Sequence, residues 1–297
     1  MLDLVIEARR HDLGGFEVGR VLPFRNRRMV GPFIFFDRMG PHRMAAPVPR
    51  QADVRPHPHI GLSTVTYLFE GEMTHRDSTG ATQAIVPGEL NWMTAGAGIT
   101  HSERFDGMRE HGGRIDGIQA WVAVPAENEE DAPSFEHHAA GTLPVGDEGG
   151  VVLRIIAGRA YGLESPAKTH SPMFYLHAEL PAGARLALPP EYAERAAFVA
   201  RGAVEVGANR FGPGRMPVFT RGATPTLKAL EDTRLMLLGG ESLGERHIFW
   251  NFVSSRKERL EQAAADWRAG RFVLPPNDDR EFIPLPESSA PSPNPMS

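Results

Sequence analysis

Two short pairs of metal-ligand residues within residues 55–104 constrain this chain more than any other feature. His57 and His59 form an H-x-H pair, and His101 and Glu103 form an H-x-E pair. The sequence between them is rich in β-branched and aromatic residues and is broken by turn signals, which is typical of antiparallel strands. Residues two apart in a strand share one face, so each pair presents both members to the same side. If the two strands face each other, three imidazoles and one carboxylate converge on one point.

Three imidazoles and one carboxylate form a donor set that suits a divalent first-row metal. Iron, manganese, nickel, copper and zinc all accept such nitrogen and oxygen ligands. Four protein ligands on a six-coordinate ion would leave two positions for water, substrate or dioxygen. We therefore predict that His57, His59, His101 and Glu103 bind one metal ion. The alternative interpretation is that each histidine is a surface residue or a hydrogen-bonded core residue.

The same stretch resembles the N-terminal signature of the pirin family, which belongs to the cupin superfamily. The motifs that carry the resemblance are H-P-H at 57–59, T-V-T-Y-L at 64–68, G-E at 71–72, H-R-D-S at 75–78, P-G at 87–88, W-M-T-A-G at 92–96 and G-I-T-H-S-E at 98–103. The resemblance implies two antiparallel cupin (jelly-roll) β-barrels packed together. It also implies metal ligands at His57, His59, His101 and Glu103, with Fe(II) as the metal and Cu, Ni, Mn or Zn as alternatives.

One position departs from the pattern of the wider superfamily. General cupins carry a glutamate three or four residues after the H-x-H pair, and most pirins keep it, whereas this chain has Ser63 there. Pirins take their carboxylate from the second pair, so the resemblance still implies a metal site. We expect that a hydrogen-bonding or proton-handling group near the metal is missing.

Composition narrows the classes of function. The chain of 297 residues is long enough for one large domain or two of ordinary size. It contains no cysteine, which excludes disulfides, thiolate metal ligands and cysteine nucleophiles. Its net charge of −5 gives no electrostatic reason to expect nucleic-acid binding. The sequence shows neither a signal-peptide pattern nor a membrane-length apolar run, so we expect a soluble cytoplasmic protein without membrane contact.

A weak internal repeat divides the chain into two similar units. Residues 67–71 resemble residues 198–202, and residues 87–90 resemble residues 213–216. This repeat predicts a duplicated barrel. In its register, the positions that correspond to the two ligand pairs carry Leu188, Pro190, Leu227 and Ala229. The second barrel is therefore expected to be metal-free.

These patterns predict an all-β protein with three parts. Residues 1–140 are expected to form the metal-binding cupin domain. Residues 141–283 are expected to form the second cupin domain and to end in a C-terminal helix. Residues 284–297 form a Pro- and Ser-rich tail, for which we predict no packed structure.

Two local patterns predict where particular elements begin and end. Ser255 followed by Glu258 is a capping-box pattern, and apolar residues at helical spacing continue as far as Gly270. We predict a helix with Ser255 as its N-cap and its apolar stripe packed on a barrel. Residues 40–54 contain several prolines and small residues, which predicts a loop at the cavity mouth.

The resemblance implies two kinds of function. Bacterial pirin-like proteins are associated with quercetinase activity, the oxidative ring opening of a flavonol. The first expectation is therefore a metal-dependent dioxygenase that acts on flavonol-like or other enolic small molecules. The substrate hydroxyl would displace metal-bound water, and Glu103 would take its proton. A small-molecule reaction unrelated to flavonols stays open, because cupin barrels host many chemistries.

The alternative is a regulatory binding protein. Some pirins act as metal-dependent partners of transcription factors or metabolic enzymes. The metal would then be a structural or redox-sensing element, and the partner would be a protein.

Overall fold

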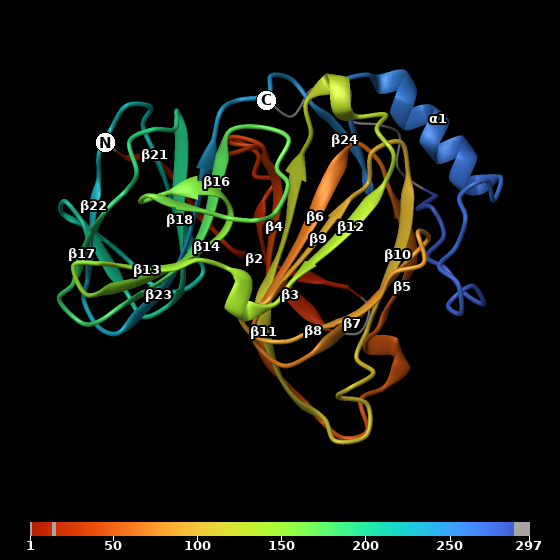
Figure 1. The fold of residues 1–297 in the computed structure, drawn as a ribbon, viewed down its shortest axis with the longest axis horizontal. Coiled ribbons are helices and arrows are strands. Elements are labelled where there is room, and N and C mark those ends of the chain that lie inside the picture. The colour runs from red at the N-terminus through yellow and green to blue at the C-terminus, as the bar shows by residue number, and fades with distance from the viewer. Residues whose placement is uncertain (1, 14–15, 288–297) are drawn as a thin grey trace.

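Two antiparallel β-barrels lie side by side, and one helix covers the outside of the first (Figure 1). The computed structural model describes residues 2–13 and 16–287. Strand segments with alternating or fully apolar patterns form the sheets, as the sequence predicts. This architecture confirms the predicted all-β fold with two cupin barrels. The predicted tail lies outside the described residues from position 288 onward.

The first barrel consists of a seven-stranded sheet and a four-stranded sheet. The larger sheet has the order β12-β9-β6-β11-β4-β3-β2, with β2 (Arg9–Asp12), β3 (Glu17–Leu22), β4 (Phe33–Met44), β6 (Leu62–Glu70), β9 (Leu90–Thr94), β11 (Gly113–Ala123) and β12 (Ser134–His138). The smaller sheet has the order β5-β10-β7-β8, with β5 (Val54–His59), β7 (Met73–Asp77), β8 (Thr82–Ile85) and β10 (Ile99–Arg104). Both ligand pairs therefore lie on the smaller sheet, on neighbouring strands.

The second barrel repeats this arrangement with shorter strands. Its larger sheet has the path β1-β21-β18-β23-β16-β14-β13, with β15 paired to β14, and contains β1 (Leu2–Glu7), β13 (Val145–Glu148), β14 (Val151–Ala160), β15 (Leu163–Glu164), β16 (Met173–Leu180), β18 (Glu194–Arg201), β21 (Arg215–Phe219) and β23 (Thr233–Gly240). Its smaller sheet, β17-β22-β19-β20, contains β17 (Arg185–Ala187), β19 (Val204–Val206), β20 (Asn209–Phe211) and β22 (Thr226–Ala229). Leu188, Leu227 and Ala229 are buried in its apolar interior. In the repeat these three positions correspond to metal-ligand positions of the first barrel, and here they carry apolar side chains that pack in the core.

The first strand of the chain belongs to the second barrel. β1 pairs antiparallel with β21, with Leu4 opposite Val218 and Ile6 opposite Met216. The arrangement departs from the prediction that residues 1–140 form one unit. Its physical cause is that Ile6 is fully buried in the apolar cluster that joins the two barrels.

The large sheets of the two barrels pack against each other through aromatic side chains. Phe36 of the first barrel lies 5.1 Å from Phe198 of the second, measured between ring centroids. Arg38 pairs with Asp116 and also donates to the carbonyl oxygen of Ala200 at 2.8 Å. This buried interface holds the two barrels in a fixed relation.

The C-terminal part of the chain returns to the first barrel. β24 (His247–Phe249) and β25 (Phe252–Ser254) form a short hairpin, and α1 (Lys257–Arg268) follows it. The apolar stripe of the helix (Leu260, Ala263, Ala264 and Trp267) is buried with Ile60 of the first barrel. The predicted helix is present, but its stripe packs on the first barrel and not on the second domain (residues 141–283) to which the prediction assigned it. In Figure 1 the helix lies beside β5 and β10, the strands of the two ligand pairs.

The predicted N-cap of this helix is wrong. Arg256 occupies the N-cap position, and no side chain caps the helix. The hydroxyl of Ser255 instead donates to the carboxylate of buried Glu129 at 3.1 Å, and its backbone N–H donates to the same carboxylate at 2.8 Å. Tertiary packing against Glu129 has therefore replaced the local capping box.

The predicted loop over residues 40–54 is shorter than expected. β4 continues to Met44 because its end pairs with the start of β11, with His42 opposite Ile115 and Met44 opposite Gly113. A single turn of 3₁₀ helix, Arg50–Ala52, interrupts the remainder. Within residues 2–13 and 16–287, no helix combines the length and the apolar character that a membrane span requires.

Candidate metal centre

Pairing of β5 with β10 brings the histidines of the two predicted pairs together. The register places His101 opposite His57 and Ile99 opposite His59. Ligand nitrogens of His57, His59 and His101 all lie within 4.8 Å of one another. The ring centroids of His57 and His101 are 4.4 Å apart, and His59 lies 5.0 Å from each of them. Metal–nitrogen bonds of about 2.0–2.1 Å would allow one ion to reach all three rings.

Backbone carbonyl groups fix the tautomers of two of these histidines. The Nδ1–H of His57 donates to the carbonyl oxygen of Arg55 at 2.9 Å, and that of His59 donates to the carbonyl oxygen of Asn251 at 3.0 Å. A carbonyl oxygen only accepts, so the proton stays on Nδ1 and the Nε2 lone pair is free to bind a metal. The Nε2 atoms of His59 and His101 face each other at 3.1 Å.

Burial keeps all three imidazoles neutral. Desolvation lowers the pKa of His57 to about 4. Desolvation and then the neighbouring imidazoles lower the pKa values of His59 and His101 well below the usual value. Neutral imidazole is the form that binds a metal. The Nδ1 atom of His101 is buried and has no hydrogen-bond partner among the described residues. The donor set and its protonation state therefore fit a metal ion.

Glu103 lies beside the three histidines and is turned away from their cluster. Its carboxylate oxygens fall outside the group of mutually close ligand atoms. One of them, Oε1, accepts from Nε2 of Gln119 at 3.1 Å and lies 3.8 Å from Nδ1 of His101. The register shift between β5 and β10 sets Glu103 opposite Val54, but its extra residue lies on β5, and β10 pairs regularly with β7 over the same residues. Burial raises the pKa of Glu103 to about 8, with Arg104 opposing the shift.

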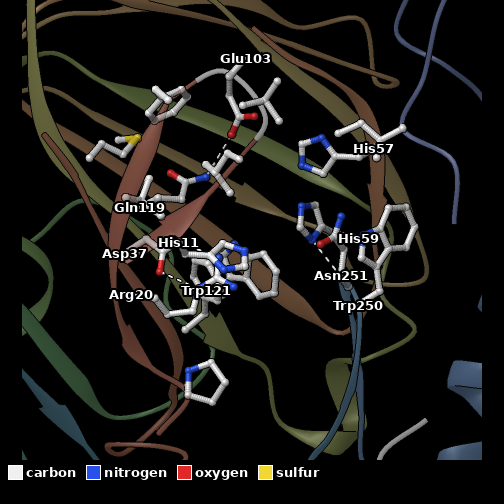
Figure 2. Close-up of a pocket in the computed structure, with 18 of the residues that line it drawn as sticks. His11, Arg20, Asp37, His57, His59, Glu103, Gln119, Trp121, Trp250 and Asn251 are labelled. Carbon is white, nitrogen blue, oxygen red and sulfur yellow. Dashed lines mark hydrogen bonds and ion pairs between the residues drawn. The ribbon is translucent and has the colours of Figure 1, made fainter. Parts of the chain in front are cut away.

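A cavity of about 450 Å³ opens onto this cluster. His57, His59 and Glu103 line one side, and Figure 2 shows Arg20 and Asp37 on the side opposite the two histidines. The remaining lining side chains are mostly apolar or aromatic, namely Leu13, Phe16, Val18, Pro23, Phe35, Met39, Val54, Met73, Trp121, Ile248, Trp250 and Ile283. His11, Gln119 and Asn251 also line it. A largely apolar cavity of this size with several polar groups is typical of small-molecule sites.

Two residues that the sequence reasoning missed support the site. Thr66 donates to Oε1 of Gln119 at 2.6 Å, and this bond orients the Gln119 amide so that its NH₂ group meets Glu103. Asn251 holds His59 through its backbone carbonyl, from a turn in which Trp250 adopts a positive φ of 53°. The polar Gln119 within the otherwise apolar run from Ile118 to Ala123 was a usable signal. A backbone carbonyl carries no sequence signal.

Ser63, the position where many cupins have glutamate, is fully buried on β6. Its hydroxyl is 2.9 Å from that of Thr94, and it is absent from the described residues that line the cavity. The hydrogen bond to Glu103 comes from Gln119 instead.

Two family profiles match most of the chain. The profile described as Pirin matches residues 15–122, and the profile described as Pirin C-terminal cupin domain matches residues 175–273. The chain belongs to the pirin family. A pirin-like protein from Caulobacter vibrioides is 61% identical to this pirin over 97% of this chain and 100% of that protein.

Two further matches carry the name of an enzyme. A protein from Pseudomonas aeruginosa named "Putative quercetin 2,3-dioxygenase" is 37% identical to this pirin over 86% of this chain and 80% of that protein. The crystal structure of a quercetin 2,3-dioxygenase from Acinetobacter baumannii matches with a TM-score of 0.87 and 30% identity, over 97% of each chain. The cupin fold and the three-histidine cluster together indicate a site for a single metal ion.

Proposed function

We propose that this pirin is a metal-dependent dioxygenase of the quercetinase type, acting on flavonol-like or other enolic small molecules. The observation that carries the proposal is the cluster of three buried, neutral imidazoles at the wall of a cavity of about 450 Å³. The relatives named as quercetin 2,3-dioxygenases support the choice of reaction. A bound first-row ion, Fe(II) first and Cu, Ni or Mn as alternatives, would supply Lewis acidity and redox chemistry, whereas Zn would supply only the former.

In this proposal His57, His59 and His101 hold the ion through their unprotonated ring nitrogens. Glu103, which in this structure faces Gln119 and lies outside the histidine cluster, would turn toward the ion as its fourth ligand and would take the proton of the substrate hydroxyl. Its pKa of about 8 in the metal-free protein falls when a cation lies nearby, so the carboxylate form becomes available. Gln119 keeps the carboxylate at the cavity wall through its hydrogen bond.

The walls of the cavity suit a planar aromatic substrate. Trp121 and Phe35 stack on each other at 4.1 Å with an angle of 14° between their planes, and both line the cavity. Trp250 and Ile283 close another side from the C-terminal part of the chain. A substrate bound between these side chains would displace water, which would strengthen every electrostatic interaction inside the site.

Oxygen consumption with quercetin tests the proposal. Metal-free protein is loaded separately with Fe, Cu, Ni, Mn and Zn, and oxygen uptake is measured together with the loss of flavonol absorbance. We expect uptake with at least one redox-active metal and none with His59→Ala. His137→Ala is the matched control, because His137 lies on β12 and bonds to Asn91 outside the cavity lining.

Absence of turnover with every metal, in protein that still binds metal, would refute the enzyme. The regulatory alternative would then be tested by asking whether a protein partner binds the metal-loaded form and releases the metal-free form.

A further inference from the structure

A charged pair lines the cavity on the side opposite the metal centre. Arg20 on β3 lies opposite Asp37 on β4 in the strand register. The guanidinium meets the carboxylate through two bonds, from Nε to Oδ1 at 2.9 Å and from Nη2 to Oδ2 at 2.8 Å. The Asp37 side chain is only 3% exposed, whereas that of Arg20 keeps 23% exposure and lines the cavity (Figure 2). Arg20 is therefore the member of the pair that is more accessible from the cavity.

Stability alone does not account for this pair. A buried ion pair is often no more stabilising than apolar residues of the same volume. Several residues that line the cavity with this pair are apolar, among them Phe16, Val18 and Met39, whereas His11 is a further polar neighbour. In cavities with apolar walls, the few polar groups are those that orient a ligand. Asp37 engages two of the five N–H donors of the guanidinium. The other three N–H donors of the guanidinium do not bond to Asp37.

An aromatic surface connects this pair to the metal centre. The ring of His59 lies 5.0 Å from that of Trp121, Trp121 stacks on Phe35 at 4.1 Å, and the guanidinium of Arg20 lies 4.6 Å above the ring of Phe35. Trp121 covers one face of Phe35 and the guanidinium of Arg20 covers the other, so a flat ligand beside this column would contact the edges of the stacked rings. A ligand with more than one ring is needed to follow this surface from His59 to Arg20.

We propose that Arg20, held by Asp37, forms a subsite for a hydroxyl group at the far end of an elongated aromatic substrate. This inference rests on the proposed function, which places the other end of the substrate at the metal centre. Asp37 already balances the charge of Arg20, so a carboxylate at this point would add an unbalanced negative charge in a poorly hydrated cavity. A hydroxyl oxygen accepts an N–H of Arg20 without that cost. The subsite therefore selects hydroxylated rings over carboxylated ones.

Calorimetric titration of the zinc-loaded protein with two flavonols tests this inference. Zinc is redox-silent, so binding is measured without turnover. Quercetin carries hydroxyl groups on its pendant ring, and galangin has the same core without them. We expect the wild-type protein to bind quercetin about tenfold more tightly than galangin, the size of one or two net hydrogen bonds.

The double variant Arg20→Met with Asp37→Leu removes both charges together and so avoids an unpaired buried carboxylate. It is expected to bind the two flavonols with equal affinity, within about twofold. Arg10→Met is the matched control, because Arg10 is an exposed arginine of the adjacent strand β2, paired with Glu17 outside the cavity. It should keep the tenfold preference.

Three outcomes would overturn the inference, and a fourth would refute the proposed function. Equal binding of both flavonols by the wild-type protein would remove the subsite and leave the proposed function standing. The double variant could also keep the preference for quercetin, or lose affinity equally for both flavonols. Either result would show that Arg20 lines the cavity without recognising the hydroxyl group. No binding of either flavonol by the wild-type protein would refute the proposed function itself. If the double variant does not fold, Arg20→Lys, which keeps the charge but loses the planar fork, should reduce the preference.

Discussion

The C-terminal strap, residues 271–287, depends on one buried arginine of the metal-site strand. Arg104 on β10 is 4% exposed. Its guanidinium donates to both carboxylate oxygens of Asp278, at 2.6 and 2.9 Å, and to Glu281 at 3.1 Å. Ser102 donates to Asp278 as well, at 2.5 Å. The strap also carries Ile283, which lines the cavity. We predict that Arg104→Met releases the strap.

The free energy lost in Arg104→Met follows from the burial of the ion pair. Removing one partner of a buried ion pair costs about 3–5 kcal/mol, and methionine fills the volume of the arginine stem, so the cavity term is small. A loss of about 3 kcal/mol in the free energy of strap opening raises the open population on the order of a hundredfold. Other contacts also hold the strap. Thr100 donates to the carbonyl oxygen of Val273 at 2.6 Å, the Ile283 N–H donates to Pro56, and the rings of Phe272 and Phe282 pack on Trp267.

Limited proteolysis under native conditions, with the fragments identified by mass spectrometry, measures this opening. Cleavage within residues 271–287 should accelerate on the order of a hundredfold in Arg104→Met, because cleavage rate follows the open population. Arg76→Met is the matched control: Arg76 pairs with Asp106, which is 44% exposed, and such exposed pairs contribute under about 1 kcal/mol. Wild-type cleavage rates in Arg104→Met would show that the strap is held by other contacts and would refute the reasoning.

Three further predictions concern protonation and packing. Burial alone would raise the pKa of Asp278, but the bonds from Arg104 and Ser102 outweigh it and lower the pKa. The resulting stabilisation is present above the unfolded pKa of about 3.9 and is lost as pH falls through the lower folded value. Strap cleavage by an acid-active protease should therefore rise as pH falls below about 4. Burial raises the pKa of Glu103 to about 8, so at pH 7 zinc binding should release about one proton more from the wild type than from Glu103→Gln. Calorimetry in buffers of different ionisation enthalpy measures this release. The difference between the two proteins should vanish well above pH 8. Phe198→Ala empties a fully buried position between the barrels and should lower the free energy of unfolding by about 3–5 kcal/mol in denaturant titration; a change below about 1 kcal/mol would contradict the packing argument.

Strand periodicity and the family motifs were sufficient to predict what is local in the site. His57 and His59 share a face because they are two residues apart in one strand, and His101 meets them because β10 is the neighbour of β5. The fold was predictable for the same reason, since apolar alternation marks the strands. Glu103 shows where this reasoning stops. Alternation places it on the same face as His101, but its carboxylate bonds to Gln119 and lies outside the close group of three imidazoles.

The rest of the site depends on long-range register, which periodicity does not encode. Arg20 and Asp37 form a pair only because β3 and β4 align at those two positions. Asn251 reaches His59 across 192 positions of sequence, through a backbone atom that every residue possesses. β1 belongs to the second barrel because Ile6 is buried between the barrels. That burial is a property of the assembled fold and not of the strand itself.

The carbonyl of Asn251 has a consequence for the order in which the protein matures during synthesis. The strands that carry His57, His59 and His101 leave the ribosome long before Asn251 and the strap are made. Until then His59 lacks its acceptor, and the cavity lacks the wall formed by Trp250 and Ile283. We therefore expect a nascent chain to hold metal poorly, with the ion acquired only after the last segment has docked.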